Sequence, residues 1–162
     1  MNLNDYIIDQ EGLDWSNLLS EWTWLLPTTL TPWIVNRLGD IIVVNEDETV
    51  SFFDVCCGRF KPIAGSRDDL IRLIDLDDNA NAWLAISIVD KLVEAGLALR
   101  PQTVYGFKVP PLLGGKYEPE NFEVTDISVH YGFLGDLYGQ MKDVPDGSKV
   151  RVKIINKPDS RD

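Results

Sequence analysis

Apolar residues near the start of the chain recur at the spacing of one helical face. The residues at positions i, i+3, i+4 and i+7 of this pattern are Trp15, Leu18, Leu19 and Trp22. Asp14 precedes them as an N-cap, and Pro27 ends the helical pattern. The run Thr31-Pro32-Trp33 offers an N-cap residue and then proline at a first helical position, which predicts a short second helix.

The next stretch has the pattern of β-strands. Residues 38–44 end in an apolar run, residues 45–49 are a polar turn, and residues 50–55 form a second β-rich run. Two such runs joined by a short polar segment predict a hairpin. Phe60 and Ile63 indicate a third strand directly afterwards.

Two helices are predicted after this strand region. Ser66 to Asp69 resembles a capping box, and apolar residues follow it at helical spacing. A longer helix is predicted from about Asn81 to Ala95, with Gly96 as the residue that terminates it. Apolar residues cover most of the circumference of this helix, which predicts a central and buried position.

The last third of the chain alternates between strands and a helix. One or two strands are predicted within 97–109, a short strand over 122–127, a helix over 127–141 and a half-buried strand over 150–154. Helices segregated from hairpins favour an α+β fold, with an antiparallel or mixed sheet built from hairpins and helices packed against it. We expect one domain over 1–162, with a helical lead-in over 1–23 and a tail over 156–162.

Charge narrows the functions that the chain can perform. Its 162 residues carry 15 Lys and Arg against 26 Asp and Glu, a formal net charge of −11. Binding to phosphate backbones or anionic membranes requires a basic face, so nucleic acid and membrane are not expected partners. A basic protein partner is favoured, because a negative field accelerates its encounter. The alternative is an acidic surface that only maintains solubility.

Other features of the sequence favour a cytoplasmic location and argue against a structural zinc site. No targeting segment is recognisable, and the apolar runs are shorter than the roughly 20 residues of a membrane span. Cys56 and Cys57 are adjacent, so they form no disulfide framework, and with one histidine they cannot complete a structural zinc site. We therefore expect a cytoplasmic protein without a structural zinc.

Two loops resemble ligand sites only in part. Gly114-Gly115 lacks both glycine-rich phosphate-binding patterns, so a turn is favoured. Asp75, Asp77 and Asp78 begin like a calcium loop, but Ala80 stands where glycine is required and Ile86 where a bidentate acid is required. No cofactor or metal is expected.

His130 is the single histidine and hence the one ready base near neutral pH. Paired with a carboxylate such as Asp126 or Asp136, it could serve a small hydrolase-type enzyme. No catalytic motif surrounds it, and a histidine on the edge of a packed helix is the favoured interpretation. We therefore expect no enzymatic activity.

Acidic residues gather in two segments that are candidate docking surfaces. The first segment contains Glu118, Glu120, Glu123 and Asp126, and the second contains Glu46, Asp47 and Glu48. Solvated loops are the alternative for both, although exposed loops commonly carry binding functions. Aromatic residues favour the first segment, because Tyr117 and Phe122 lie within it and aromatics are enriched in interface cores.

The order of residues over much of the chain resembles a known family. The distinctive part is Tyr105-Gly106-Phe107-Lys108-Val109-Pro110-Pro111-Leu112-Leu113-Gly114-Gly115-Lys116-Tyr117, continued by Asn121-Phe122-Glu123-Val124, Val129-His130 and Gly135-Asp136-Leu137-Tyr138-Gly139-Gln140. Upstream matches include Arg37-Leu38-Gly39-Asp40, Phe53-Asp54-Val55, Ile63-Ala64 and Trp83-Leu84. Over residues 24–155 the chain is similar to the C-terminal domain of bacterial type VI secretion immunity proteins that neutralise a DNase toxin.

This resemblance implies a cytoplasmic immunity protein that binds and occludes a cognate toxin, without catalysis or a cofactor. A nuclease toxin binds DNA through a basic cleft, and an acidic protein that fills the cleft competes with phosphate. The expected partner is thus a basic DNase. The residues expected to face it are Glu118, Glu120, Glu123, Asp126, Glu46, Asp47, Glu48 and Tyr117. An interaction module with a non-toxin partner is the remaining alternative.

Overall fold

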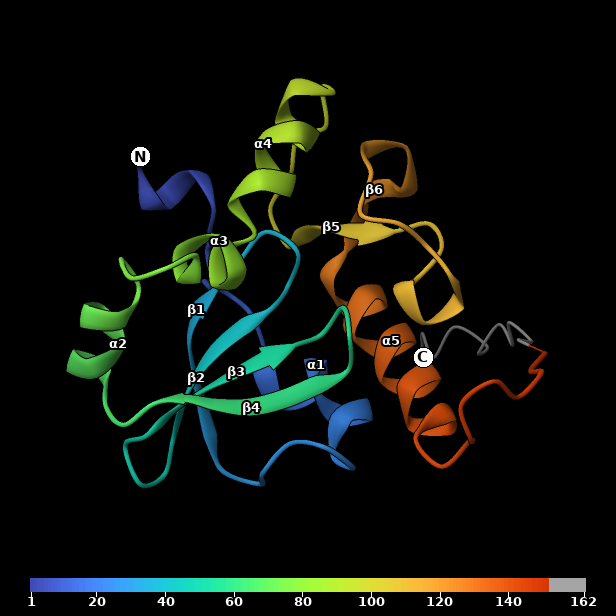
Figure 1. Cartoon of the computed structure of the whole chain (residues 1–162), viewed down its shortest axis with the longest axis horizontal. Coiled ribbons are helices and arrows are strands. Elements are labelled where there is room, and N and C mark those ends of the chain that lie inside the picture. The colour runs from blue at the N-terminus through green and yellow to red at the C-terminus, as the bar shows by residue number, and fades with distance from the viewer. Residues whose placement is uncertain (152–162) are drawn as a thin grey trace.

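The computed structural model describes residues 1–151, which form two antiparallel sheets flanked by helices (Figure 1). A four-stranded sheet has the order β1 (Leu30–Val35), β2 (Ile41–Asn45), β3 (Val50–Asp54), β4 (Arg59–Ala64), and β5 (Thr103–Phe107) pairs with β6 (Phe122–Asp126). The α-helices are α1 (Trp15–Leu18), α2 (Arg67–Leu73), α3 (Asn79–Leu84), α4 (Ile86–Glu94) and α5 (Ile127–Met141). Short 3-10 helices are η1 (Leu3–Asp5), η2 (Ser20–Trp22), η3 (Pro111–Leu113) and η4 (Pro119–Asn121). The predicted α+β class is confirmed.

Helices cover both faces of the four-stranded sheet. Ile41 and Val43 of β2 belong to a larger core cluster with residues of η2 and α5, whereas Ile42 belongs to a smaller cluster with Leu70 of α2 and Trp83 of α3. Successive residues of a strand point to opposite faces, so covering both faces requires a continuous apolar run. This accounts for the run at 41–44, which is buried at every position.

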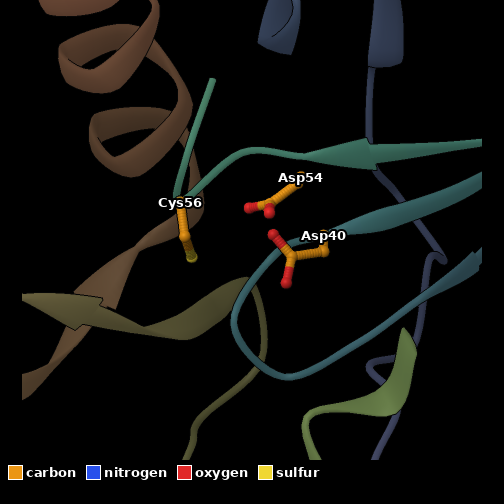
Figure 2. A group of neighbouring side chains, drawn as sticks. All are labelled: Asp40, Asp54 and Cys56. Atoms are coloured by element: carbon orange, nitrogen blue, oxygen red, sulfur yellow. The ribbon is translucent and has the colours of Figure 1, made fainter. Parts of the chain in front are cut away.

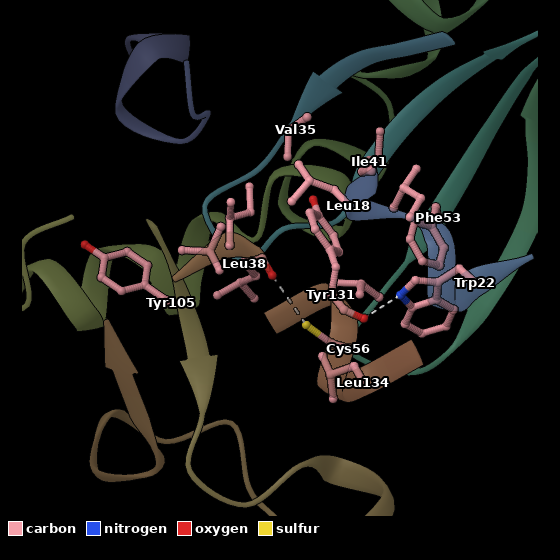
Figure 3. Packing of buried hydrophobic residues seen from close by; sticks show 14 of the residues in the cluster. Leu18, Trp22, Val35, Leu38, Ile41, Phe53, Cys56, Tyr105, Tyr131 and Leu134 are labelled. Atoms are coloured by element: carbon pink, nitrogen blue, oxygen red, sulfur yellow. Dashed lines mark hydrogen bonds between the residues drawn. The ribbon is translucent and has the colours of Figure 1, made fainter. Parts of the chain in front are cut away.

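Trp22 joins the N-terminal segment to the larger core (Figure 3). Its ring centroid lies 4.8 Å from that of Phe53, in an edge-on arrangement, and its indole N–H donates to the Tyr131 carbonyl at 2.9 Å. A Cβ at Gly135 of α5 would lie 2.8 Å from this indole nitrogen, so only glycine admits the contact. The predicted helical lead-in therefore packs directly on α5.

The helix termini and hairpins follow the sequence closely. Asp14 caps α1 by accepting from the Asn17 amide, and the Ser66 side chain caps α2 by accepting from the Asp69 amide. The predicted hairpin is formed by β2 and β3, and the third strand is β4. In the capping box, the Asp69 carboxylate accepts from Gly65 rather than from Ser66.

The short helix predicted at Thr31-Pro32-Trp33 is wrong, because these residues lie in β1. Among the strands of residues 1–151, β1 pairs with β2 alone and is an edge strand, and its pairing register shifts between Pro32 and Ile34. Proline is tolerated at the edge of a sheet and near such irregularities, because an edge strand does not need every N–H for pairing.

The single helix predicted over 81–95 is also wrong, because it is two helices that break at Ala85. Ala85 adopts a left-handed conformation with φ 55°, and the Asn81 side chain accepts from the Ser87 amide at 2.9 Å. Trp83 of α3 belongs to the smaller core cluster, whereas Leu92 of α4 belongs to the larger one. The break lets the chain pass from one cluster to the other. Gly96, with φ 88°, ends α4 as predicted.

Three predictions about the C-terminal third have different outcomes. β5, β6 and α5 lie where strands and a helix are predicted. The strand expected over 150–154 falls mainly on residues 152–154, which are outside the described residues. Within residues 1–151, no helix combines the length and apolar composition that crossing a bilayer requires.

Candidate docking surface

The first acidic segment lies on the β5–β6 hairpin and the loop that joins its strands. Phe107 pairs with Phe122 at the end of the ladder, and residues 108–121 form the loop (Figure 1). Gly114 ends η3 with φ 90°, so Gly114-Gly115 forms a turn, and no helix starts directly after it, since residues 115–118 are not helical. The loop exposes Tyr117, Glu118 and Glu120.

Asn121, the last residue of this loop, fixes the loop by binding backbone groups earlier in it. Its side-chain amide donates to the carbonyls of Val109 and Lys116, at 2.9 Å each, and its oxygen accepts from the Val109 amide at 2.9 Å. A Cβ at Gly115 would overlap the Val109 carbonyl oxygen, so glycine is required there. The loop is therefore preorganised, which reduces the entropy lost when it binds a partner.

Tyr117 anchors the loop while leaving part of its ring at the surface. The ring centroid lies 5.0 Å from that of Phe107 in an edge-on arrangement, and the side chain is 45% exposed. Its hydroxyl lies 3.6 Å from the Cys57 sulfur, and burial of this end raises the pKa of Tyr117. A half-exposed, immobilised aromatic ring is typical of an interface anchor.

The four acids predicted in this segment are all exposed, but they differ in what they bind. Asp126 caps α5 by accepting from the backbone amides of Ser128 and Val129, and a hydrogen bond from the Ser128 hydroxyl lowers the pKa of Asp126. Glu118, Glu120 and Glu123 are exposed. Asp126 therefore has a structural task, and the three glutamates are the acids best placed to meet a partner.

The second acidic segment lies elsewhere and is engaged within the chain. Asp47 accepts from the amide and the hydroxyl of Thr49, which lowers the pKa of Asp47, and Glu48 forms an ion pair with Arg67 at 3.0 Å. The β2–β3 turn that carries Glu46, Asp47 and Glu48 projects on the opposite side of the molecule from the β5–β6 loop (Figure 1). The structure thus does not bring the two acidic segments together.

His130 is buried against the turn before β2, rather than on the edge of its helix. It is 4% exposed, and its Nε2 lies 2.8 Å from the Leu38 carbonyl oxygen. Burial lowers the pKa of His130 to about 4. Within residues 1–151 its hydrogen-bond partners include no carboxylate, since Asp126 binds Ser128 and Asp136 binds Gln140. The acid–base pair required by the hydrolase hypothesis is not formed by these residues.

A small pocket lies beside His130, and the sequence gives no local signal for it. The pocket has a volume of about 170 Å³ and is bounded by β5, β6 and α5. Its lining includes Gly106, Glu123, Thr125 and His130, together with exposed apolar residues of α5, Val129 and Phe133. The predicted acid Glu123 thus lies at the edge of a hollow with apolar walls.

A separate cluster of potential metal ligands is buried under the sheet ends (Figure 2). One ligand atom from each of Asp40, Asp54 and Cys56 lies within 4.8 Å of the others, and the two carboxylates point toward each other. The Asp40 oxygens accept from the Asn36 side chain and the Val55 amide, at 3.0 Å each. Burial raises the pKa of Asp40 to about 7 and raises the pKa of the Cys56 thiol. The bond from the Val55 amide to Asp40 joins the turn before β2 to the end of β3, so the cluster has a structural role.

These observations define an α+β protein with a rigid, acidic and partly aromatic loop beside a small pocket. The family model for the C-terminal domain of the type VI secretion system immunity protein Tdi1 matches residues 64–138. This segment runs from the end of β4 into α5 and includes the whole loop. The family resemblance predicted from the sequence is therefore confirmed over residues 64–138.

Comparison with other proteins adds one structure. The crystal structure of Atu4351 from Agrobacterium tumefaciens is similar to this chain with a TM-score of 0.48 and 18% sequence identity. The similarity covers 75% of this chain and 60% of that protein, so the chain corresponds to only part of its length. No curated protein matches the chain.

Proposed function

We propose that this protein is a cytoplasmic immunity protein that binds and occludes a cognate nuclease toxin, acting as one domain over 1–162. The match of residues 64–138 to the type VI secretion immunity family carries this proposal. The immunity role of the family implies a toxin partner. The DNase activity, the basic surface of the toxin and the location of the encounter are the finer parts of the proposal.

The β5–β6 loop is the proposed contact surface. Its support is the combination of exposed glutamates, a half-exposed Tyr117 and a backbone that Asn121 fixes in place. The net charge of −11 attracts a basic protein and accelerates its capture. Asp126 and the turn with Glu46, Asp47 and Glu48 remain in the proposed contact set as weaker members, because the carboxylates of Asp126, Asp47 and Glu48 already have partners in the chain.

Occlusion needs no chemical step. Acidic side chains that occupy a basic cleft replace the phosphates that the cleft binds, and water is excluded around the aromatic anchor. No residue of the contact surface has to change its protonation state. The inhibitor would therefore act at a one-to-one ratio with the toxin.

The test is capture of the partner from lysate of the source cell, at low and high salt, with identification of the retained protein by mass. The isolated partner is then assayed for cleavage of plasmid DNA while this protein is titrated in. We expect the cleavage to stop at an equimolar ratio. Retention of a neutral metabolic protein, or cleavage that persists at excess inhibitor, would contradict the proposed function.

A further inference from the structure

The hydrogen bond of His130 determines which of its ring nitrogens carries the proton. A carbonyl oxygen can only accept, so Nε2 donates to Leu38 and, in the neutral ring, Nδ1 is an unprotonated acceptor. Within residues 1–151, no hydrogen-bond partner of Nδ1 is found, and every fully buried side-chain nitrogen or oxygen has a partner, so Nδ1 is open to the pocket although the residue is only 4% exposed. A donor that enters the pocket can therefore reach this acceptor and satisfy it.

Gly106 directs this acceptor toward the pocket. A Cβ at Gly106 would lie 3.3 Å from Nδ1 and 2.5 Å from the Thr125 hydroxyl oxygen. Any other residue would therefore fill the space between the two polar groups. Glycine at this position keeps open a polar end of the pocket, formed by Nδ1 and the Thr125 hydroxyl.

The remaining walls determine the chemistry of the occupant. Phe107, Val129 and Phe133 provide apolar surface, and the Glu123 carboxylate provides negative charge at the rim. An anion would meet this carboxylate and an acceptor nitrogen, so it is disfavoured even though Lys108 also borders the pocket. A guanidinium group has five donors and no acceptor, pairs with carboxylates and stacks on aromatic rings.

We propose that the pocket between β5, β6 and α5 binds an arginine side chain of the partner protein. Its guanidinium donates to Nδ1 of His130 and to the Glu123 carboxylate while it packs on Phe133. Val129 and Phe133 are four residues apart on one face of α5, so their exposed surface adjoins the pocket mouth and can be covered by the backbone of the partner. The site lies beside the proposed toxin-binding loop, and its role in immunity rests on the proposed function.

The binding chemistry can be tested on this protein without the toxin. N-acetyl-arginine N-methylamide is titrated into the ¹⁵N-labelled protein, with the citrulline analogue as a neutral probe of the same shape. We expect millimolar binding of the arginine probe, shifts confined to amides around Gly106, Glu123 and Thr125, and an upfield shift of the His130 Nδ1 resonance. The citrulline probe should bind at least about fivefold more weakly, since it lacks the charge-assisted bonds.

Two matched substitutions test whether Glu123 is the carboxylate that binds the arginine probe. Glu123→Gln should weaken arginine binding about fivefold, whereas Glu118→Gln removes the same charge from the nearby loop and should change it by less than about twofold. Both residues are exposed, so both variants should fold as the parent does.

Each remaining outcome would overturn the proposal. These are shifts spread over the surface, equal binding of citrulline, an unmoved Nδ1 resonance, or tighter binding of inorganic phosphate than of the arginine probe. The result is independent of the proposed function. An arginine pocket can be confirmed when no nuclease is inhibited, and immunity can hold with the pocket disproved.

Discussion

The two acidic segments look alike in the sequence but differ in the fold. At the β2–β3 turn, Asp47 and Glu48 bind Thr49 and Arg67, so their charges complete a short hairpin. In the β5–β6 loop, the backbone is held by Asn121, and Glu118 and Glu120 project from it. Charge density alone therefore does not identify a docking surface. What distinguishes the β5–β6 loop is that its backbone is held by Asn121 and not by the carboxylates of its glutamates.

The largest effect on stability should come from adding a side-chain atom at Gly115, where the β5–β6 loop packs against its own backbone. Gly115→Ala would place a Cβ on the Val109 carbonyl and should lower the free energy of unfolding by about 3 kcal/mol, in the range of severe overpacking. Gly114→Ala is the control, because nothing lies within 4 Å of its Cβ and only its φ of 90° is unfavourable, for about 1 kcal/mol. Urea denaturation measures both. Equal losses would mean that the loop is not closed at Gly115.

Removing the asparagine side chain that stabilises each region should reduce stability by different amounts in the two regions. Asn121→Ala loses three hydrogen bonds to backbone groups and should cost about 2 kcal/mol, with faster proteolysis within 108–121. Asn45→Ala at the β2–β3 turn loses two bonds, to Thr49 and Ser51, and should cost about 1 kcal/mol. If Asn121→Ala left proteolysis of the loop unchanged, the preorganisation inferred for this loop would be wrong.

Charge reversal tests which region meets the toxin. The variant Glu118→Lys/Glu120→Lys/Glu123→Lys should slow association with the captured toxin by about tenfold and reverse its dependence on salt. The variant Glu46→Lys/Asp47→Lys/Glu48→Lys has the same change in charge and should slow association by about threefold or less. Stopped-flow mixing at two salt concentrations gives both rates. A larger effect at the β2–β3 turn would move the docking surface to that side.

The smallest effect concerns two of the carboxylates whose pKa is lowered, Asp126 and Asp47. Asp126→Ala removes the cap of α5 and should cost about 1 kcal/mol at pH 7, whereas Asp47→Ala affects only an exposed turn and should cost less. A lowered folded-state pKa means that the native state binds fewer protons than the unfolded state near pH 4. The stabilisation from Asp126 is therefore present above about pH 4 and lost as the pH falls through the folded-state pKa. Thermal denaturation from pH 7 to pH 3 should show the two curves of parent and Asp126→Ala converging.

Local patterns predicted the elements whose determinants are local. The caps Asp14 and Ser66 and the hairpin turn depend on neighbours a few residues away, and each was predicted correctly. Pro32 misled the prediction because proline suits both a helix start and an edge strand, and only the sheet decides between them. The break at Ala85 has a similar origin, since two core clusters compete for one apolar segment.

The candidate site was predictable only in part. Exposure of the acids follows from their density in loops, and their placement in a toxin interface stays a prediction. The partner of His130 is Leu38, 92 residues away, so no local signal could give the orientation of the ring or the free acceptor beside Gly106. Asn121 is likewise inconspicuous in the sequence, because its partners are backbone groups that any residue supplies.

The packing of Trp22 on Gly135 has a consequence for how the segment matched by the family model could be exchanged by recombination. The matched segment begins at residue 64. Its helix α5 packs through Gly135 on Trp22, which lies over 100 residues upstream and outside the segment. A fragment that begins at residue 64 would contain Gly135 but not the Trp22 side chain that packs on it, so we expect that it would not fold alone. Recombination could thus exchange the β5–β6 loop between chains that keep this tryptophan, but it could not transplant the matched segment as an autonomous module.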